Sequence, residues 1–172
     1  DEMRALFAEL PEACDNTLAI AERIGDYSDV FRQVDRMPQF VVPAGETQSS
    51  WLRKEIERGI TVRFGDTPPS DLRDRVELEM SVIEPMGYSS YFLIVADICR
   101  YARENGVPVG PGRGSAAGSM VSFLTQIIEV NPMQHGLLFE RFLNPERISP
   151  PDIDLDFDDR RPPKLLSHVT NK

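Results

Sequence analysis

Residues 150–159, PPDIDLDFDD, decide the fold class, because acidic and apolar side chains alternate along them. In a β-strand, side chains two residues apart point to the same face. The alternation predicts a strand with carboxylates on one face and core side chains on the other, namely Asp152, Asp154 and Asp156 against Ile153, Leu155 and Phe157. Such close carboxylates repel one another unless a cation joins them. Mg²⁺ usually binds one or two carboxylates together with substrate phosphates, so the strand predicts a metal platform for phosphate chemistry.

Two other structures also place several acids close together in sequence. A solvated edge strand carries charged side chains on its open face, and this alternative stays open. A calcium loop starting at Asp152 would need glycine at its sixth position and glutamate at its twelfth. The chain has Phe157 and Pro163 there, which argues strongly against a calcium loop.

A glycine-rich loop, VGPGRGSAAGS at residues 109–119, precedes a helical pattern. Gly112 and Gly114 let backbone N–H groups approach an anion, while Arg113 and Ser115 add a cation and a hydroxyl suited to phosphate. The loop is not a Walker motif, because it contains no lysine. It matches the dinucleotide fingerprint only loosely, because no acidic residue ends a second strand about 20 residues later. A structural turn is a further alternative, since glycine often serves geometry alone.

Together, the loop and the aspartate strand predict metal-dependent nucleotidyl transfer. The loop would hold a triphosphate, and the aspartates would hold two Mg²⁺ ions roughly 3.5–4 Å apart. One ion would activate a 3′-hydroxyl, and the other would stabilise the leaving pyrophosphate.

The order of the remaining elements predicts a mixed α/β fold. The apolar run YFLIVA, residues 91–96, has the length of a buried strand. Asp97 is placed to cap the helix that follows it. Helical patterns occupy six other segments, residues 1–25, 49–60, 70–86, 97–106, 116–128 and 136–147. Pro11 and Asn16 indicate a break of the first segment into two helices, with Asp15 or Asn16 as the cap of the second.

Composition narrows the class of protein. The chain has 172 residues, of which 41% are apolar, and a net charge of −9. The acidic total argues against nucleic-acid binding without excluding it, because cations bound to an acidic cluster would compensate its charge. Cys14 and Cys99 are interpreted as buried reduced thiols. The sequence shows neither a membrane span nor a signal peptide, and a cytoplasmic location is predicted.

Several segments resemble the palm of the bacterial replicative DNA polymerase III alpha subunits (family C). The resemblance lies in GYSSYFLIVADICRYARENGVPVGPGRGSAAGS, GLLFERFLNPER and PDIDLDFDDRR, and extends more weakly to the N-terminus. It implies a polymerase-β-like nucleotidyltransferase palm, a twisted sheet with flanking helices, over residues 67–172. Residues 1–66 would be a helical connector from the side of the family's PHP domain.

The resemblance also implies roles for individual residues. Gly112, Arg113, Gly114 and Ser115 would bind the triphosphate, Asp152 and Asp154 would be the catalytic metal pair, Asp156 would be a third metal candidate, and Arg141 and Arg147 would contact phosphate or template. Surface ion pairs are the alternative for both arginines. The implied partners are dNTP, primed template DNA, the sliding clamp and other replisome subunits.

The chain departs from the family pattern in three segments and in extent. It has SMVSFLTQIIEVNP where the family tends to have SLVAYALGITDIDP, and Pro162 and Pro163 follow Arg161 where the family tends to have a Gly-led helix. It has SPPDID where the family usually has SMPDID, and the family's third carboxylate, fingers and thumb lie beyond these residues. DNA affinity depends on many phosphate contacts, so the isolated chain is expected not to polymerise DNA. Two other classes are weighed: a non-catalytic cation-binding or interaction module, and a dinucleotide-dependent oxidoreductase that rests on Gly112 and Gly114 alone.

Overall fold

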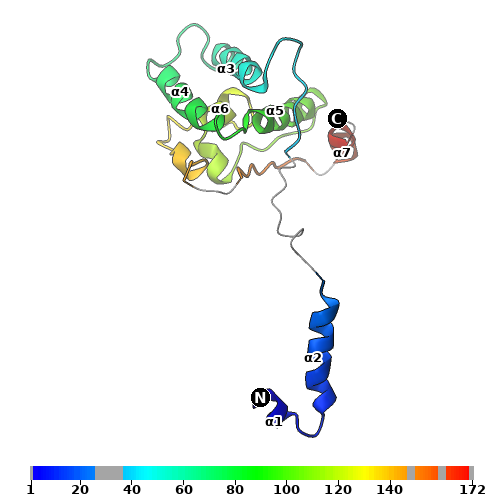
Figure 1. The fold of residues 1–172 in the computed structure, drawn as a ribbon. Coiled ribbons are helices and arrows are strands. Elements are labelled where there is room, and N and C mark those ends of the chain that lie inside the picture. The colour runs from blue at the N-terminus through cyan, green and yellow to red at the C-terminus, as the bar shows by residue number, and fades with distance from the viewer. Residues whose placement is uncertain (1, 26–36, 147–149, 159–161, 171–172) are drawn as a thin grey trace. The chain divides into compact units, whose positions relative to one another are not determined.

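The computed structural model describes residues 2–25, 37–146, 150–158 and 162–170. The chain forms two compact units, residues 1–36 and 37–172 (Figure 1). The boundary predicted at residues 66 and 67 concerns parts of a parent polymerase, and it stays a prediction. No helix among the described residues is both long and apolar enough to cross a bilayer.

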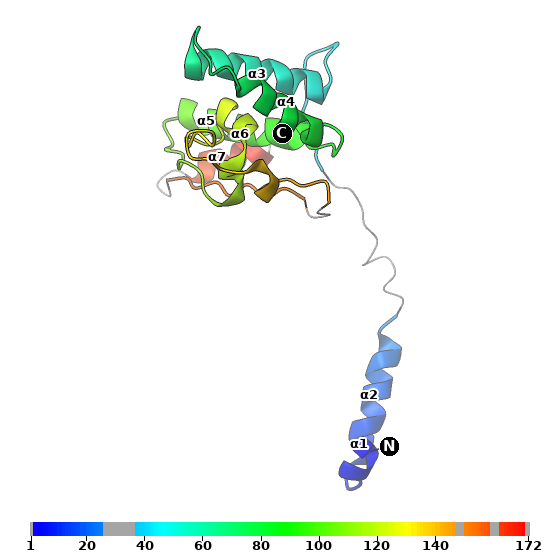
Figure 2. The ribbon, with the colours of Figure 1, turned by 90° about the vertical axis from the view of Figure 1, so that its left-hand side faces the viewer.

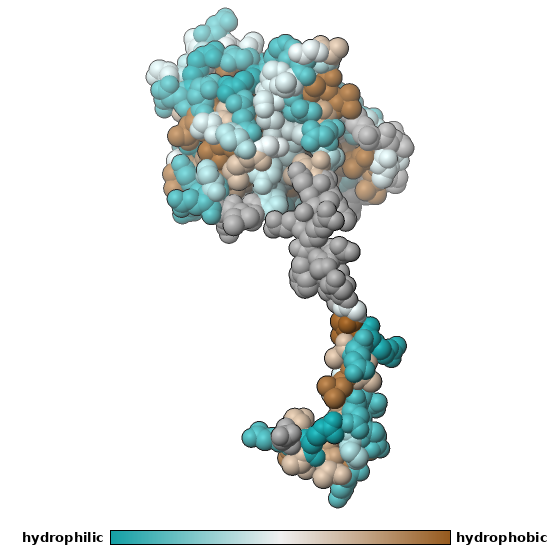
Figure 3. Space-filling view, viewed as in Figure 1, coloured by the Kyte–Doolittle hydropathy of each residue, from teal (hydrophilic) through white to brown (hydrophobic). Residues whose placement is uncertain are grey.

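The first unit contains two helices, α1 (Glu2–Leu6) and α2 (Pro11–Arg23). The predicted division into two helices is confirmed, but α2 begins at Pro11 and continues through Asp15 and Asn16, so neither of these residues caps it. Proline suits the first turn of a helix because its missing N–H has no partner there in any case. Leu18, Ile20 and Ile24 are exposed. The surface of this unit therefore carries hydrophobic side chains (Figure 3).

The second unit contains five α-helices among its described residues, and one hydrophobic core lies between them (Figures 1 and 2). They are α3 (Gln48–Phe64), α4 (Leu72–Ile83), α5 (Ser89–Glu104), the short α6 (Met120–Leu124) and α7 (Pro162–Thr170). A capping box between Thr47 and Ser50 starts α3, since each side chain accepts a hydrogen bond from the other residue's backbone N–H. α3 packs against α5 and α6, α4 packs against α6, and α5 packs against α7.

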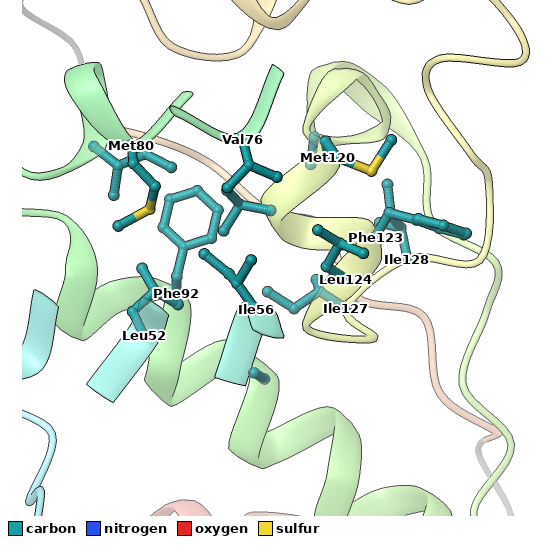
Figure 4. Packing of buried hydrophobic residues seen from close by; sticks show 14 of the residues in the cluster. Leu52, Ile56, Val76, Met80, Phe92, Met120, Phe123, Leu124, Ile127 and Ile128 are labelled. Carbon is teal, nitrogen blue, oxygen red and sulfur yellow. The ribbon is translucent and has the colours of Figure 1, made fainter. Parts of the chain in front are cut away.

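The core contains buried side chains from four helices, and every residue of the short α6 is buried. Ile56 of α3, Val76 of α4, Phe92 of α5 and Leu124 of α6 all belong to the buried cluster (Figure 4). α3 approaches the backbone of α6 so closely that Gly59 has no room for a side chain. A Cβ atom on Gly59 would lie 2.0 Å from the carbonyl oxygen of Leu124.

The predicted α/β palm sheet is wrong. The described ranges of the chain contain no β-strand, and residues 150–158 form one isolated antiparallel bridge, between Phe157 and Val109. The run YFLIVA is part of α5 instead of a strand. It is apolar on most sides because α5 is covered by neighbours, and both of its flanks continue the helix.

The predicted helices at residues 49–60 and 70–86 correspond to α3 and α4 with slightly different ends, and the remaining helices differ more. Asp97 lies inside α5 and therefore does not cap it. The pattern at residues 116–128 divides into the 3₁₀-helix η1 (Gly114–Gly118) and α6. In the predicted segment 136–147, the described residues 136–146 contain a second 3₁₀-helix, η2 (Phe139–Arg141), in place of an α-helix.

The two cysteines are expected to differ strongly in reactivity. Cys99 is completely buried in the core, whereas Cys14 is half-buried. Burial raises the pKa of the Cys99 thiol to about 11, and only the thiolate attacks alkylating reagents. In the folded chain near neutral pH, alkylation of Cys99 should be slower than that of Cys14 by on the order of 100-fold. Mass spectrometry of peptides measures both rates, and equal rates in the folded chain would contradict the prediction.

Candidate functional site

The glycine loop and the aspartate segment lie side by side. The N–H of Gly110 donates to the carbonyl oxygen of Asp156 at 2.8 Å, and the N–H of Asp158 donates to that of Pro108 at 3.3 Å. A Cβ atom on Gly110 would lie 3.1 Å from the Cβ of Asp156. Glycine at this position therefore permits the approach of two segments that are distant in sequence.

Arg113 connects the loop to two of the predicted metal ligands. Its Nη1 lies 2.9 Å from Oδ2 of Asp154, and its Nε lies 3.0 Å from Oδ2 of Asp156. Ile153 and Leu155, which alternate with these aspartates, pack against the core as the alternation predicts. Phe157, the third predicted core side chain, is half-buried at the bridge with Val109 and is not one of the residues that pack against the core cluster. The extended segment thus brings both carboxylates to the guanidinium of Arg113, and it does so without being part of a sheet.

Asp152 is exposed and lies beside the hydroxyl of Tyr91. The N–H of the following residue, Ile153, donates to Oη of Tyr91 at 3.0 Å. Burial raises the pKa of the Tyr91 hydroxyl, and the charges of Asp152 and Asp154 raise it further. Tyr91 was not among the predicted site residues, because its sequence position lies inside a run interpreted as core.

The fit to a metal ion depends on how many carboxylates converge. The described residues contain no group of three or more His, Cys, Asp or Glu side chains placed to hold a metal. Asp154 and Asp156 do converge on one guanidinium. In proteins, Mg²⁺ is usually bound by one or two carboxylates together with substrate phosphates, so Asp154 and Asp156 are suitable ligands for Mg²⁺.

A cavity of about 230 Å³ adjoins the glycine loop. Its lining comes from η1 on one side and from the turn that leads to η2 on the other: Gly114, Ser115, Ala117, Gly118, Gly136, Leu137, Leu138 and Arg141. Three predicted phosphate contacts, Gly114, Ser115 and Arg141, therefore share one hollow. Arg147, the other predicted contact, lies outside the described residues.

The glycines of the loop meet different neighbours. Gly112 has a φ of +98°, and a Cβ atom there would lie 2.5 Å from Cγ2 of Ile128, so this glycine is required for packing against the core. Gly114 has a φ of +67°, and its Cβ position faces Oδ2 of Asp154 at 3.4 Å. Of the two, Gly114 is the one directed toward the carboxylates and the cavity.

A buried carboxylate, that of Glu79, holds the residues that follow the loop and is not indicated by the sequence. Glu79 of α4 is 0% exposed and accepts four hydrogen bonds, from Arg75 Nε, Ser119 Oγ, Met120 N and Val121 N. Burial raises the pKa of the Glu79 carboxyl, while the four donors favour its charged form. The only sequence signal is the spacing of Arg75 and Glu79 by four residues on α4, which also suits a surface ion pair.

Comparison with known proteins identifies the family. Residues 50–172 match the family model described as the bacterial DNA polymerase III alpha NTPase domain. The DNA polymerase III subunit alpha of Mycobacterium tuberculosis (strain H37Rv) is 54% identical over 99% of this chain and 14% of its own length. The subunit of Mycobacterium leprae is 52% identical over 99% of the chain, and that of Xylella fastidiosa (strain Temecula1) is 42% identical over 100%.

The chain spans only 14–15% of the length of these relatives. Its match to the family model nevertheless covers the glycine loop, the aspartate segment and all residues that line the cavity. The chain belongs to the family of bacterial DNA polymerase III alpha subunits.

Proposed function

We propose that this chain supplies nucleotide- and metal-binding residues of a DNA-directed DNA polymerase, in the palm of the full-length protein. The observation that carries the proposal is the position of Arg113. It joins the glycine loop to Asp154 and Asp156 beside a cavity that Ser115 and Arg141 line. Cations and a hydroxyl next to paired carboxylates suit a triphosphate that is bound together with Mg²⁺.

Each group would have a separate part in nucleotidyl transfer. Gly114 leaves the space beside Asp154 free of a side chain, and the guanidinium of Arg141 would bind phosphate oxygens in the cavity. Asp152 and Asp154 form the proposed catalytic pair, and Asp156 is a third candidate. Of these, Asp154 and Asp156 already converge on Arg113, so Asp152 would have to approach them when the ion binds. When bound, Mg²⁺ supplies activation of the primer 3′-hydroxyl and charge for the leaving pyrophosphate. Arg113 would exchange its contacts with the aspartates for contacts with the nucleotide.

The proposal extends to the partners of the full-length protein. They are dNTP, primed template DNA, the sliding clamp and other replisome subunits, with the cytoplasm as the location. The isolated chain is expected not to extend a primer, because its net charge of −9 opposes DNA and it offers few phosphate contacts.

A non-catalytic cation-binding or interaction module is the second candidate. It is favoured by the absence, among the described residues, of a group of three metal-binding side chains. It is also favoured by Arg113, which already pairs with two aspartates. In this alternative, the aspartates would bind a cation or a protein partner without nucleotide.

Calorimetric titration of Mg²⁺ and dATP into the chain distinguishes the two candidates. The parent chain should bind dATP only with Mg²⁺ present, and Asp152→Asn/Asp154→Asn should weaken this binding by on the order of 10- to 100-fold. Asp66→Asn/Asp74→Asn is the matched control, since it removes the same charge from exposed residues outside the cavity lining. Metal binding without any metal-dependent binding of dATP would support the non-catalytic module instead.

A further inference from the structure

We propose that Arg75 is a positioning residue for the candidate nucleotide site, an inference that rests on the proposed nucleotide-binding function. Its Nη2 donates to the carbonyl oxygen of Gly118 at 2.7 Å and to that of Leu137 at 3.3 Å. Gly118 and Leu137 line the cavity from opposite segments. One nitrogen of α4 therefore holds both walls of the hollow that would receive the triphosphate.

Glu79 fixes the direction of this guanidinium. Nε of Arg75 donates to Oε1 of Glu79 at 2.7 Å, one helical turn along α4. The guanidinium is planar and rigid, so fixing Nε also fixes where Nη2 points. We call the two hydrogen bonds from Arg75 Nη2 to Gly118 and Leu137 the Arg75 clamp. Glu79 belongs to the buried face of α4, so its contact with Arg75 attaches this clamp to the core of the unit.

The same carboxylate fixes the end of the glycine loop. Glu79 accepts from Met120 N at 2.8 Å and Val121 N at 3.0 Å, the first two residues of α6. It also accepts from Ser119 Oγ at 2.9 Å. Arg75 thus holds the cavity wall at Gly118, and Glu79 holds the segment directly after it. A buried ion pair contributes little net stability compared with an apolar pair of the same size, so its specific effect lies in geometry.

The two walls would not keep their separation without Arg75. A Cβ atom on Gly118 would lie 2.5 Å from the carbonyl oxygen of Leu138, so the walls already touch at one edge. The carbonyl oxygens of Gly118 and Leu137 converge on a single donor nitrogen. When that donor is removed, two partly buried carbonyl oxygens with like partial charge face each other and lose their shared donor. We expect the walls to move apart.

Loss of Arg75 should affect the binding of nucleotide and not the binding of metal. Arg75 has no contact with Asp154 or Asp156, which pair with Arg113. Loss of the clamp should therefore weaken dATP binding while leaving Mn²⁺ binding in the absence of nucleotide unchanged. A displacement of about 1 Å in the groups that position a substrate can reduce the rate of a reaction by about 100-fold. Here we expect a loss of dATP affinity on the order of tenfold.

Two variants and one control test the clamp in the 172-residue chain. Arg75→Lys keeps the positive charge beside Glu79 but has one donor nitrogen in place of Nε and Nη2. Arg75→Met removes the charge. Arg73→Met, two residues away on α4, removes the same charge from an exposed pair with Glu57 and is the matched control. If Arg75→Met does not fold by circular dichroism, Arg75→Lys decides the outcome.

Hydrogen exchange without ligand is the first measurement. In the Arg75 variants, amides at residues 114–121 and 136–138 should exchange at least about tenfold faster, while those of α3 and α5 stay as protected as in the parent. The control should match the parent throughout. Unchanged exchange at these residues, or equal acceleration across α3 and α5, would overturn the inference.

Calorimetry with dATP and Mg²⁺, and with Mn²⁺ alone, is the second measurement. A loss of dATP affinity of about tenfold with unchanged Mn²⁺ affinity is expected for Arg75→Lys. A dATP affinity within twofold of the parent would overturn the positioning role. If the parent chain itself does not bind dATP, the proposed function fails for this chain, and the exchange rates still decide whether the clamp exists.

Discussion

Gly59→Ala is expected to destabilise the second unit by about 3 kcal/mol or more, although alanine is the better helix former. The substitution would add about 1 kcal/mol of helix propensity in an open position. At Gly59, however, the new Cβ would lie 2.0 Å from the carbonyl oxygen of Leu124. Overpacking of a filled core costs typically about 1–3 kcal/mol, and more where the obstacle is backbone. The clash therefore decides the sign.

Urea unfolding followed by circular dichroism measures the free energy directly. Val62→Ala on the exposed side of the same helix is the control, and it should change the free energy by less than about 0.5 kcal/mol. A Gly59→Ala chain as stable as the parent would mean that α3 and α6 do not approach as closely as the structure shows.

The sequence predicts the helices whose periodicity is clear. α3 and α4 were expected from apolar residues at helical spacing, and the break between α1 and α2 was expected from Pro11. These elements are amphipathic or begin with a proline, so local residues suffice to indicate them.

The run YFLIVA shows where local residues do not suffice. A short apolar run suits a buried strand and a buried helix equally, and periodicity alone does not separate them. The distinguishing signal was longer than the run. Phe92, Ala96 and Cys99 are buried at positions i, i+4 and i+7, which is the face of a helix that continues beyond Asp97.

The candidate site was predictable as chemistry and only partly as geometry. The sequence indicated that the aspartates and the glycine loop belong to one site, because metal-dependent nucleotidyl transfer needs both. The structure brings Arg113, Asp154 and Asp156 together. Glu79 was not predictable, because its partners at residues 119–121 lie about 40 positions away. From α4 alone, it looks like one more charge on a solvated face.

In the full-length polymerase, Asp154→Asn is expected to reduce primer extension by on the order of 1,000-fold. The amide removes a charge from the proposed metal pair but keeps the shape of the side chain. Asp154 also faces Gly114 in the loop and pairs with Arg113, so both the metal and the nucleotide depend on it. Single-turnover extension of a primed template in Mg²⁺ measures the rate of the chemical step. A loss below about tenfold would exclude Asp154 from the catalytic pair.

Arg113→Gln separates the charge of the loop from that of the metal pair. Its guanidinium occupies the position between Asp154 and Asp156, where it competes with a cation. Its removal should therefore strengthen Mn²⁺ binding to the nucleotide-free protein and weaken dATP binding, each by roughly three- to tenfold, since the ion pairs are partly exposed. Asp154→Asn should weaken both. Opposite responses of the two ligands to Arg113→Gln would show that the arginine exchanges partners, whereas parallel weakening would show that it only holds the aspartates in place.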